Sequence, residues 1–397
     1  MNILMISPKP PRGAVPRPYA MAKHLVQLDH QVTLVMVSET ERWRTEVYNW
    51  DGIRAVVIPH LLNGRLSYGW DPYDTFRRIL FLNRDSEQYD LVHCFETRPS
   101  VIHPCQWVSL KKHIPFVTDW NDWFGRGGLV KYNRPSWYHI LRLERIETFY
   151  EEAFRAKAAG LTVISSVLGQ RAIELGVKPD RISHIPGGVF LDLFVPRPQN
   201  ECRQRMGFPL EIPILGFSSS DTHFDLEIIM QALKIVSRSF PTIKLIISGN
   251  PRPGVREMVA RYDLKQQICF IGYVNYEELL WYLGCANLFL LPMADLPHNR
   301  GRWPNKIGEY MCLGRPTIAN PVGDIKELFQ KHQVGLSADW DPVDLAEKIM
   351  ILLEDHEMAA RLGENAREVA ETEYDWRILT GKLEQFYSRI IQYEKSL

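Results

Sequence analysis

Short runs of apolar residues recur along the chain, and stretches with helical spacing separate them. In the first half the apolar runs cover residues 3–6, 32–37, 55–58, 91–93 and 161–164. The helical stretches between them include 19–28 and 144–159. A short, unbroken apolar run is typical of a strand that is buried on both faces of a parallel sheet. This half of the chain therefore predicts a parallel sheet covered by helices.

The same alternation starts again after a loop-like segment at 192–198, which contains Pro196 and Pro198 and predicts a linker. Beyond it, strands are predicted at 214–217, 245–248, 268–271, 288–291 and 317–319, and helices at 226–239, 276–283 and 306–313. Two rounds of alternation predict an α/β protein of two Rossmann-like, doubly wound domains, residues 1–192 and 193–375. Ligands bind such sheets beyond the carboxyl ends of their strands, so we expect the domains to face each other across a cleft.

The end of the chain is helical in pattern. The last predicted helix, 377–393, carries aromatic and aliphatic residues at helical spacing. An apolar stripe of this kind is stable only when it is buried against another element. We therefore expect residues 376–397 to pack back on the first domain.

Composition narrows the class of protein. The chain has 397 residues, with 47 Lys and Arg against 47 Asp and Glu, so its formal net charge is zero. A groove for nucleic acid needs a strongly positive surface, and we expect no nucleic-acid partner. The six cysteines include no C-x-x-C pair, which argues against a disulfide scaffold and a zinc knuckle and favours a reducing compartment. The N-terminus is strand-like and no long apolar stretch occurs, so a cytoplasmic location is expected.

The most informative segment, residues 304–316, reads Pro-Asn-Lys-Ile-Gly-Glu-Tyr-Met-Cys-Leu-Gly-Arg-Pro. Pro304 at a helix start leaves the amides of Asn305 and Lys306 free, and free amides beside an ammonium group suit a diphosphate. Glu309, one turn further, can accept hydrogen bonds from the hydroxyls of a ribose. From spacing alone, a plain capped helix with a solvated Glu309 explains the segment equally well.

The pattern Pro-x-Lys-x-x-Glu-Tyr-Met-x-x-Gly-x-Pro resembles the donor-site helix of the "group 1" glycosyltransferases, glycosyltransferase family 4. Other segments resemble that family in the expected order: 161–165, 185–189, 270–274, 288–292 and 319–324. The resemblance covers nearly the whole chain. It implies a GT-B fold, in which the second domain mainly holds a nucleotide sugar and the first mainly holds the acceptor.

The resemblance also implies an activity and several site residues. The expected reaction is transfer of a hexose-type sugar, with retention and without metal or other cofactor, to a glycan, lipid-linked or small-molecule acceptor. Glu309 matches the glutamate that binds the nucleotide ribose, and Asn305 and Lys306 match positions that line the nucleotide and its phosphates. No pair of histidines has the spacing of metal ligands, so no metal site is expected.

Three positions depart from the family pattern. Gly301 stands where the family often has a first glutamate, and the serine run 218–220 stands where it has a basic pair. The third departure is Asp119-Trp120-Asn121-Asp122-Trp123, in place of a histidine. These departures keep two alternatives open: a GT-B-shaped sugar-nucleotide-binding protein without turnover, and a GT-B-like epimerase.

Residues just before the donor helix can replace the missing contacts. Arg300 and Arg302 can pair with phosphate oxygens, and Asp295 and Asn299 can reach sugar hydroxyls. The alternative for the two arginines is an ordinary solvated loop. We include all four in the expected donor site.

In the first domain, carboxylates and glycines gather at the predicted carboxyl end of a strand. Asp119 and Asp122 are the expected catalytic residues, because carboxylates can orient an acceptor hydroxyl or act as a base. Gly127, in a glycine-rich turn, and Gly13 and Arg17, after the first strand, form the expected phosphate and acceptor loop. The alternative is a turn with N-caps and a surface arginine.

Residues 126–142 contain cations and aromatic rings but no acid. Such a segment suits an anionic lipid surface, and we expect a peripheral contact with the inner face of a membrane there. The alternative is that the aromatic rings pack into the core while the cations extend into water.

Overall fold

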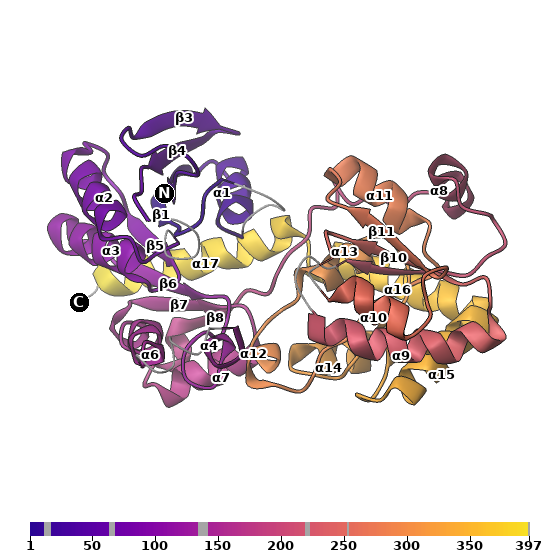
Figure 1. The fold of residues 1–397 in the computed structure, drawn as a ribbon. Coiled ribbons are helices and arrows are strands. Elements are labelled where there is room, and N and C mark those ends of the chain that lie inside the picture. The colour runs from indigo at the N-terminus through magenta and orange to yellow at the C-terminus, as the bar shows by residue number, and fades with distance from the viewer. Residues whose placement is uncertain (12–16, 63–67, 134–141, 219–222, 252–253, 396–397) are drawn as a thin grey trace. The chain divides into compact units, whose positions relative to one another are not determined.

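The computed structural model describes residues 1–11, 17–62, 68–133, 142–218, 223–251 and 254–395 (Figure 1). The chain forms two compact units. Unit 1 comprises Met1–Pro186, Gly301–Trp303 and Trp376–Leu397, and unit 2 comprises Gly187–Arg300 and Pro304–Asp375. Unit 1 thus ends at Pro186 rather than at the expected residue 192, and it also includes three residues from the loop before the donor helix.

Within the described residues, unit 1 contains an eight-stranded sheet in the order β3-β4-β2-β1-β5-β6-β7-β8. The strands are β1 Asn2–Ile6, β2 Gln31–Val37, β3 Glu46–Trp50, β4 Ile53–Ile58, β5 Leu91–Phe95, β6 Phe116–Trp120, β7 Gly160–Val163 and β8 Ile182–His184. Neighbouring strands are parallel, except that β3 and β4 are antiparallel. Residues such as Ile3 and Val92 are fully buried, as expected for a sheet covered on both faces.

The α-helices of unit 1 follow the strands in sequence. They are α1 Arg17–Gln27, α2 Pro72–Arg84, α3 Pro99–Lys112, α4 Leu129–Asn133, α6 Glu144–Glu152, α7 Ser166–Glu174 and α17 Trp376–Lys395. Helix α17 returns to this unit from the end of the chain and contacts α1 (Figure 1). A Cβ built on Gly160 of β7 would lie 2.6 Å from the Phe386 ring, so α17 packs directly on the sheet.

Unit 2 contains a parallel sheet in the order β11-β10-β9-β12-β13-β14 among the residues that the structure describes. The strands are β9 Ile214–Ser218, β10 Lys244–Ser248, β11 Ile268–Gly272, β12 Leu288–Leu291, β13 Thr317–Ala319 and β14 Gly335–Ser337. The helices are α8 Gln199–Met206, α9 His223–Ser239, α10 Val255–Arg261, α11 Tyr276–Gly284, α12 Pro297–Arg300, α13 Asn305–Cys312, α14 Asp324–His332, α15 Pro342–Glu354 and α16 His356–Glu373. The two predicted Rossmann-like α/β domains are confirmed.

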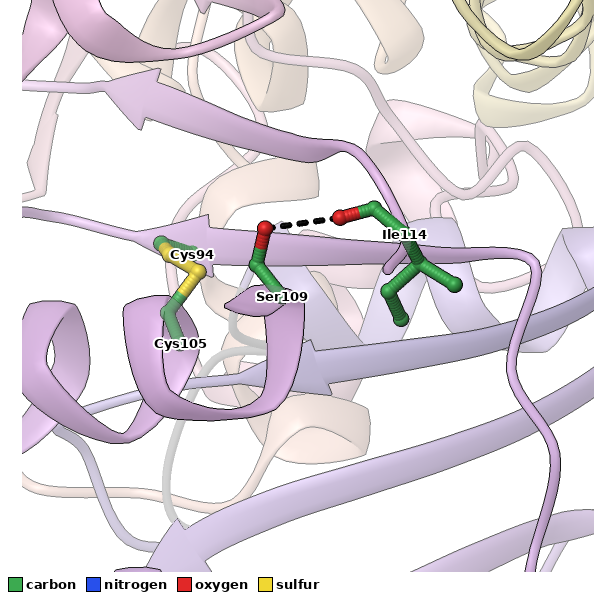
Figure 2. The surroundings of a disulfide bond; sticks show 4 residues. All are labelled: Cys94, Cys105, Ser109 and Ile114. Carbon is green, nitrogen blue, oxygen red and sulfur yellow. Dashed lines mark hydrogen bonds between the residues drawn. A yellow bond between two sulfur atoms is a disulfide. The ribbon is translucent and has the colours of Figure 1, made fainter. Parts of the chain in front are cut away.

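Two of the cysteines are joined, which the sequence analysis did not expect. Cys94 of β5 and Cys105 of α3 form a disulfide, and both are fully buried (Figure 2). The strand and the helix that follows it pack together, and this brings two cysteines 11 positions apart into bonding range. Near the end of the same helix, the Ser109 hydroxyl donates a hydrogen bond to the carbonyl oxygen of Ile114 at 2.7 Å.

Candidate functional site

Helix α13 of unit 2 begins as the sequence analysis expected. Pro304 is its N-cap, in an extended conformation, and makes no side-chain capping bond. A proline side chain has no acceptor, so it leaves the first amides of α13 available to an anion. Asn305 is exposed at this end, and the Lys306 ammonium lies 5.0 Å from the centre of the Phe217 ring of β9.

The next residues of α13 fix the helix to the sheet. The Ser218 amide, at the carboxyl end of β9, donates a hydrogen bond to the Tyr310 hydroxyl at 2.7 Å. The Tyr310 ring stacks on Phe289 of β12 at 4.2 Å. A Cβ built on Gly308 would lie 2.3 Å from Val189 Cγ1, so only glycine allows this close approach. The motif therefore holds the start of α13 at the carboxyl end of the parallel strand β9.

Glu309 is half-buried, and burial raises the pKa of its carboxyl group to about 7, against the opposing charge of Lys306. Its negative charge also helps to raise the pKa of Tyr276, where burial is the larger cause. Within the described part of the chain, no residue donates a hydrogen bond to the Glu309 carboxylate. A carboxylate in this position can accept hydrogen bonds from ligand hydroxyls.

The loop before α13 holds the other expected donor residues, and it uses three of them internally. Arg300 forms a two-bond ion pair with Asp295, at 2.5 and 2.7 Å, in which both side chains are more than half exposed. Asn299 is buried, and its Nδ2 donates to the Ala294 carbonyl at 2.8 Å. The structure therefore places these residues in one segment, where Arg300 and Asp295 pair with each other and Asn299 binds the backbone.

Gly301 and Arg302 belong to unit 1. The Ser165 hydroxyl donates to the Gly301 carbonyl at 2.8 Å, and a Cβ on Gly301 would lie 3.3 Å from both Leu168 Cδ2 and Trp123 Cβ. A glutamate at position 301 would therefore crowd a packed site. The structure divides the expected donor set, since Arg302 belongs to unit 1, where its charge opposes the rise in the pKa of the Asp122 carboxyl group that burial causes.

Asp119 and Arg17 form a buried ion pair in unit 1. Nε and Nη2 of Arg17 donate to the Asp119 carboxylate at 3.1 and 3.0 Å, and the Thr162 hydroxyl donates to it at 2.5 Å. Arg17 Nη1 also donates to the Pro186 carbonyl at 2.9 Å, and its guanidinium lies 5.9 Å from the Trp376 ring. Each charge is therefore paired with the other inside the protein, and the expected catalytic role of Asp119 and the expected anion contact of Arg17 stay predictions.

Asp122 lines a pocket of unit 1 at the carboxyl ends of β5 and β6. The pocket is small, with about 20 Å³ of space, which is enough for roughly one water molecule. Its lining residues include Glu96, Thr97, Arg98, Asp122, Phe124, Glu147, Tyr150, Glu151 and Arg155. Burial raises the pKa of Asp122 and the charge of Glu96 raises it further, while the charges of Lys9 and Arg302 oppose this. A carboxyl group with a raised pKa is suited to exchange a proton with a substrate.

The charged neighbours of Asp122 were missed by the sequence analysis. Glu96 lies directly after β5 with a φ of 74°, and its carboxylate pairs with Arg98 at 3.2 Å and lies 4.0 Å from the Lys9 ammonium. Arg98 also lies 3.8 Å from Glu147. The signal was present, because Glu96 and Arg98 follow the buried apolar strand β5 immediately.

The loop that carries Asp122 is held by Glu151 of α6. Its carboxylate accepts hydrogen bonds from the amides of Phe124 and Gly125, both at 2.7 Å, and from Trp120 Nε1 at 3.2 Å. A Cβ on Gly125 would lie 2.5 Å from Glu151 Oε2, so this glycine serves the protein's own packing. Gly127 has a φ of 78° and open space where a Cβ would lie. Gly13 lies outside the described residues.

The expected lipid-contacting segment 126–142 is described only in part, because residues 134–141 lie outside the described residues. In the remainder, Arg126, Lys131 and Tyr132 are exposed. No helix in the described part of the chain is both long and apolar enough to cross a membrane. Likewise, no group of three or more His, Cys, Asp or Glu side chains among the described residues is placed to hold a metal ion.

Models of glycosyltransferase families match both units of the chain. The model of "Glycosyltransferase Family 4" matches residues 11–193, and that of "Glycosyl transferases group 1" matches residues 200–369. A GDP-mannose-dependent monoacylated alpha-(1-6)-phosphatidylinositol monomannoside mannosyltransferase of Corynebacterium glutamicum is 26% identical over 209 residues, which is 50% of this chain and 54% of that protein. The chain spans about half the length of the curated relatives it matches.

Solved structures share the fold over the full length. Sucrose-phosphate synthase of Thermosynechococcus elongatus has a TM-score of 0.74 at 20% identity, covering 99% of each chain. HepE of Anabaena, solved with UDP and glucose, has a TM-score of 0.69 at 17% identity, covering 98% of this chain and 100% of that one. At these identities the similarity shows a common fold.

Proposed function

This chain belongs to the group 1 glycosyltransferases, and we propose that it transfers a hexose-type sugar from a nucleoside diphosphate to an acceptor hydroxyl. The observation that carries the proposal is the start of α13, where uncapped helix amides, Lys306 and a half-buried Glu309 come together. HepE, solved with UDP and glucose, supports a nucleotide sugar as the donor.

The donor binds at α13. The Glu309 carboxylate accepts hydrogen bonds from the ribose hydroxyls, and the diphosphate lies against the first amides of the helix and Lys306. As the bond from the anomeric carbon to the diphosphate breaks, these groups stabilise the negative charge of the leaving group without a metal ion. The new bond forms to the acceptor oxygen with retention at the anomeric carbon, as in the family that the sequence resembles.

The acceptor presents its attacking hydroxyl to the Asp122 pocket of unit 1, which has room for a group of about the size of one water molecule. Asp122 takes the proton of the attacking hydroxyl, because its carboxyl group lies among charged neighbours in a partly buried pocket. Glu96 and Arg98 position Asp122 through the surrounding charge network. The acceptor is a glycan, a lipid-linked sugar or a small molecule; the mannosyltransferase of C. glutamicum, named for a phosphatidylinositol substrate, supports a lipid-linked one.

A second candidate function is binding of a sugar nucleotide without turnover. It is favoured by the Arg300–Asp295 pair, which engages a cation expected for the diphosphate, and by the packing that fills the position of the family glutamate at Gly301.

The experiment combines binding and turnover. A panel of nucleotide sugars is tested for thermal stabilisation, and the best one is then tested for sugar transfer to candidate acceptors, with and without EDTA. Glu309→Ala should lose both stabilisation and transfer, whereas Glu347→Ala, at an exposed position of α15, should keep both. Full activity of Glu309→Ala would refute the donor site. Binding with no transfer to any acceptor would favour the second candidate, and complete loss in EDTA restored by magnesium would refute the metal-free mechanism.

A further inference from the structure

A row of polar side chains is buried in unit 1 between the sheet and α17. His93 of β5, Asp119 of β6 and Thr162 of β7 have no exposed surface, and neither does Tyr387 of α17. Asp119 and Thr162 are in register in the parallel strands β6 and β7, and β5 adjoins β6 on its other side. Each of these buried polar groups needs a hydrogen-bond partner, because an unpaired one costs free energy.

The directions of the hydrogen bonds follow from the Asp119 carboxylate, which is ionised in its pair with Arg17 and can only accept. The Thr162 hydroxyl donates to it, so the lone pairs of that hydroxyl are left to accept from His93 Nε2 at 3.2 Å. Burial lowers the pKa of His93 to about 4, so at pH 7 the ring is neutral and carries one hydrogen, on Nε2. Nδ1 is then an acceptor, and the Tyr387 hydroxyl donates to it at 2.6 Å.

The result is a chain of hydrogen bonds with one direction, in which Tyr387 donates to His93, His93 to Thr162, and Thr162 to Asp119. Hydrogen bonds in such a chain polarise one another, so that each one strengthens the next. At the end of the chain the Asp119 carboxylate also accepts from Arg17. Helix α17 therefore contributes to the surroundings of Asp119 through two intermediate side chains.

The end of β6 connects this hydrogen-bond chain to the Asp122 pocket. Arg155 Nη1 donates to the Asp119 carbonyl at 3.2 Å, and the Arg155 guanidinium lies 4.0 Å from the centre of the Trp120 ring. Trp120 Nε1 donates to the carbonyl oxygen of Asp122 at 3.0 Å. Both the side chain and the backbone of Asp119 are thus fixed, and the indole of the next residue holds the backbone of Asp122. A shift of Asp119 would therefore move Trp120, and with it Asp122.

We propose that Tyr387, His93 and Thr162 are positioning residues for the Asp122 pocket, which they hold in place through Asp119 and the end of β6. The proposal rests on the proposed function of that pocket in sugar transfer. A polar contact that served only to attach α17 would end at His93, whereas this one continues through Thr162 to the carboxyl end of β6.

The directions of the hydrogen bonds are tested on the full chain by heteronuclear NMR of its histidine rings. The His93 signals are those that disappear in His93→Gln. At pH 7 we expect a hydrogen on Nε2 and none on Nδ1, and in Tyr387→Phe the Nδ1 signal should move further towards that of a nitrogen without a donor. A hydrogen on Nδ1, or on both nitrogens, at pH 7 would overturn the proposed chain.

Two substitutions at position 162 separate positioning from packing. Thr162→Val keeps the shape of the side chain and removes its hydroxyl, whereas Thr162→Ser keeps the hydroxyl. The matched control is Thr118→Val, because Thr118 is equally buried in β6 and its hydroxyl has no hydrogen-bond partner in the described part of the chain. Well below the melting temperatures, amide exchange of residues 121–125 should be about fivefold faster in Thr162→Val and unchanged in the other two variants.

Turnover gives a second readout of the same variants. With a donor and an acceptor that react, kcat of Thr162→Val should fall about tenfold at an unchanged KM for the donor, and Thr162→Ser should restore it. The proposal is overturned if Thr162→Val changes neither exchange nor kcat, if it changes only one of them, or if Thr118→Val changes both as much. If the unaltered chain transfers sugar to no acceptor, the proposed function fails instead, and amide exchange alone decides whether Thr162 positions the pocket.

Discussion

At the scale of single residues, Glu309 changes charge near neutral pH. Burial raises its pKa from 4.5 to about 7, so the carboxyl group is mostly protonated at pH 6 and mostly ionised at pH 8. The ionised form accepts hydrogen bonds from ribose hydroxyls more strongly than the protonated form, because the acceptor then carries a charge. We therefore expect the affinity for a nucleoside diphosphate to rise about tenfold between pH 6 and pH 8, measured by calorimetry.

The matched variant is Glu309→Gln, which should bind the nucleoside diphosphate more weakly and with the pH dependence of the diphosphate alone.

The pH dependence of folding stability gives a second measurement of the same carboxyl group. Between pH 4.5 and 7 the folded state holds a proton that the unfolded state releases, so this group lowers the free energy of unfolding as pH rises through that window. Well above pH 7 neither state holds this proton, so the contribution of Glu309 to the free energy of unfolding no longer changes with pH. Identical pH profiles for the two proteins would contradict the assignment of Glu309.

Asp119 and Asp122 show what residue patterns can and cannot predict. Asp119 is the fourth residue of β6 and Asp122 follows the end of that strand, and both were expected to act in catalysis. Their surroundings differ through Arg17, which pairs with Asp119 from 102 positions away. Spacing along the chain contains no information on such a partner. The start of α13, by contrast, depends on residues within one helical turn, and its position was predictable from the motif.

At the scale of elements, most buried strands were predictable because they read as apolar runs, whereas the buried strand β6 includes the polar residues Thr118 and Asp119. Strand β3, Glu46–Trp50, was not predicted, because it is an edge strand with mostly exposed residues and no such run. The link between β5 and α3 was also missed. In the sequence Cys94 and Cys105 are 11 positions apart and show no pairing pattern; they come within bonding distance only because α3 packs on β5.

That disulfide predicts a dependence of stability on reductant. Opening a loop of this size increases the entropy of the unfolded chain, so Cys105→Ser should lower the free energy of unfolding by about 3 kcal/mol. Urea unfolding with and without dithiothreitol measures it. The reductant should destabilise the unaltered chain and leave Cys105→Ser unchanged. If alkylation of the denatured, unreduced chain modifies all six cysteines, the bond is absent.

At the scale of the whole molecule, alternation of strands and helices was sufficient to predict two α/β domains. The assignment of Gly301–Trp303 to unit 1 was not predictable, because it depends on contacts such as that between Ser165 and Gly301. For α17 the apolar stripe predicted only that the helix is buried. The partners in the structure include His93 Nδ1, which lies 2.6 Å from the Tyr387 hydroxyl.

Because α17 packs on unit 1, we expect the stability of unit 1, and not that of unit 2, to depend on this helix. Leu383 is fully buried, so Leu383→Ala should cost about 2–5 kcal/mol and lower the melting temperature of unit 1. Ile378 of the same helix is 36% exposed, and Ile378→Ala should cost far less. Calorimetry should show the transition of unit 2 unchanged in both variants. A shift of both transitions by Leu383→Ala would show that the units unfold together.

The return of α17 to unit 1 has a consequence for synthesis on the ribosome. The sheet of unit 1 emerges first, yet α17, which covers part of it, is translated only after every residue of unit 2. At ordinary elongation rates the nascent sheet waits about 10–40 s for that helix. During this interval the surface around Gly160, which Phe386 and Ile390 cover in the folded protein, is exposed and open to chaperones. Unit 1 therefore begins to fold before unit 2 but cannot complete its packing until unit 2 has been translated.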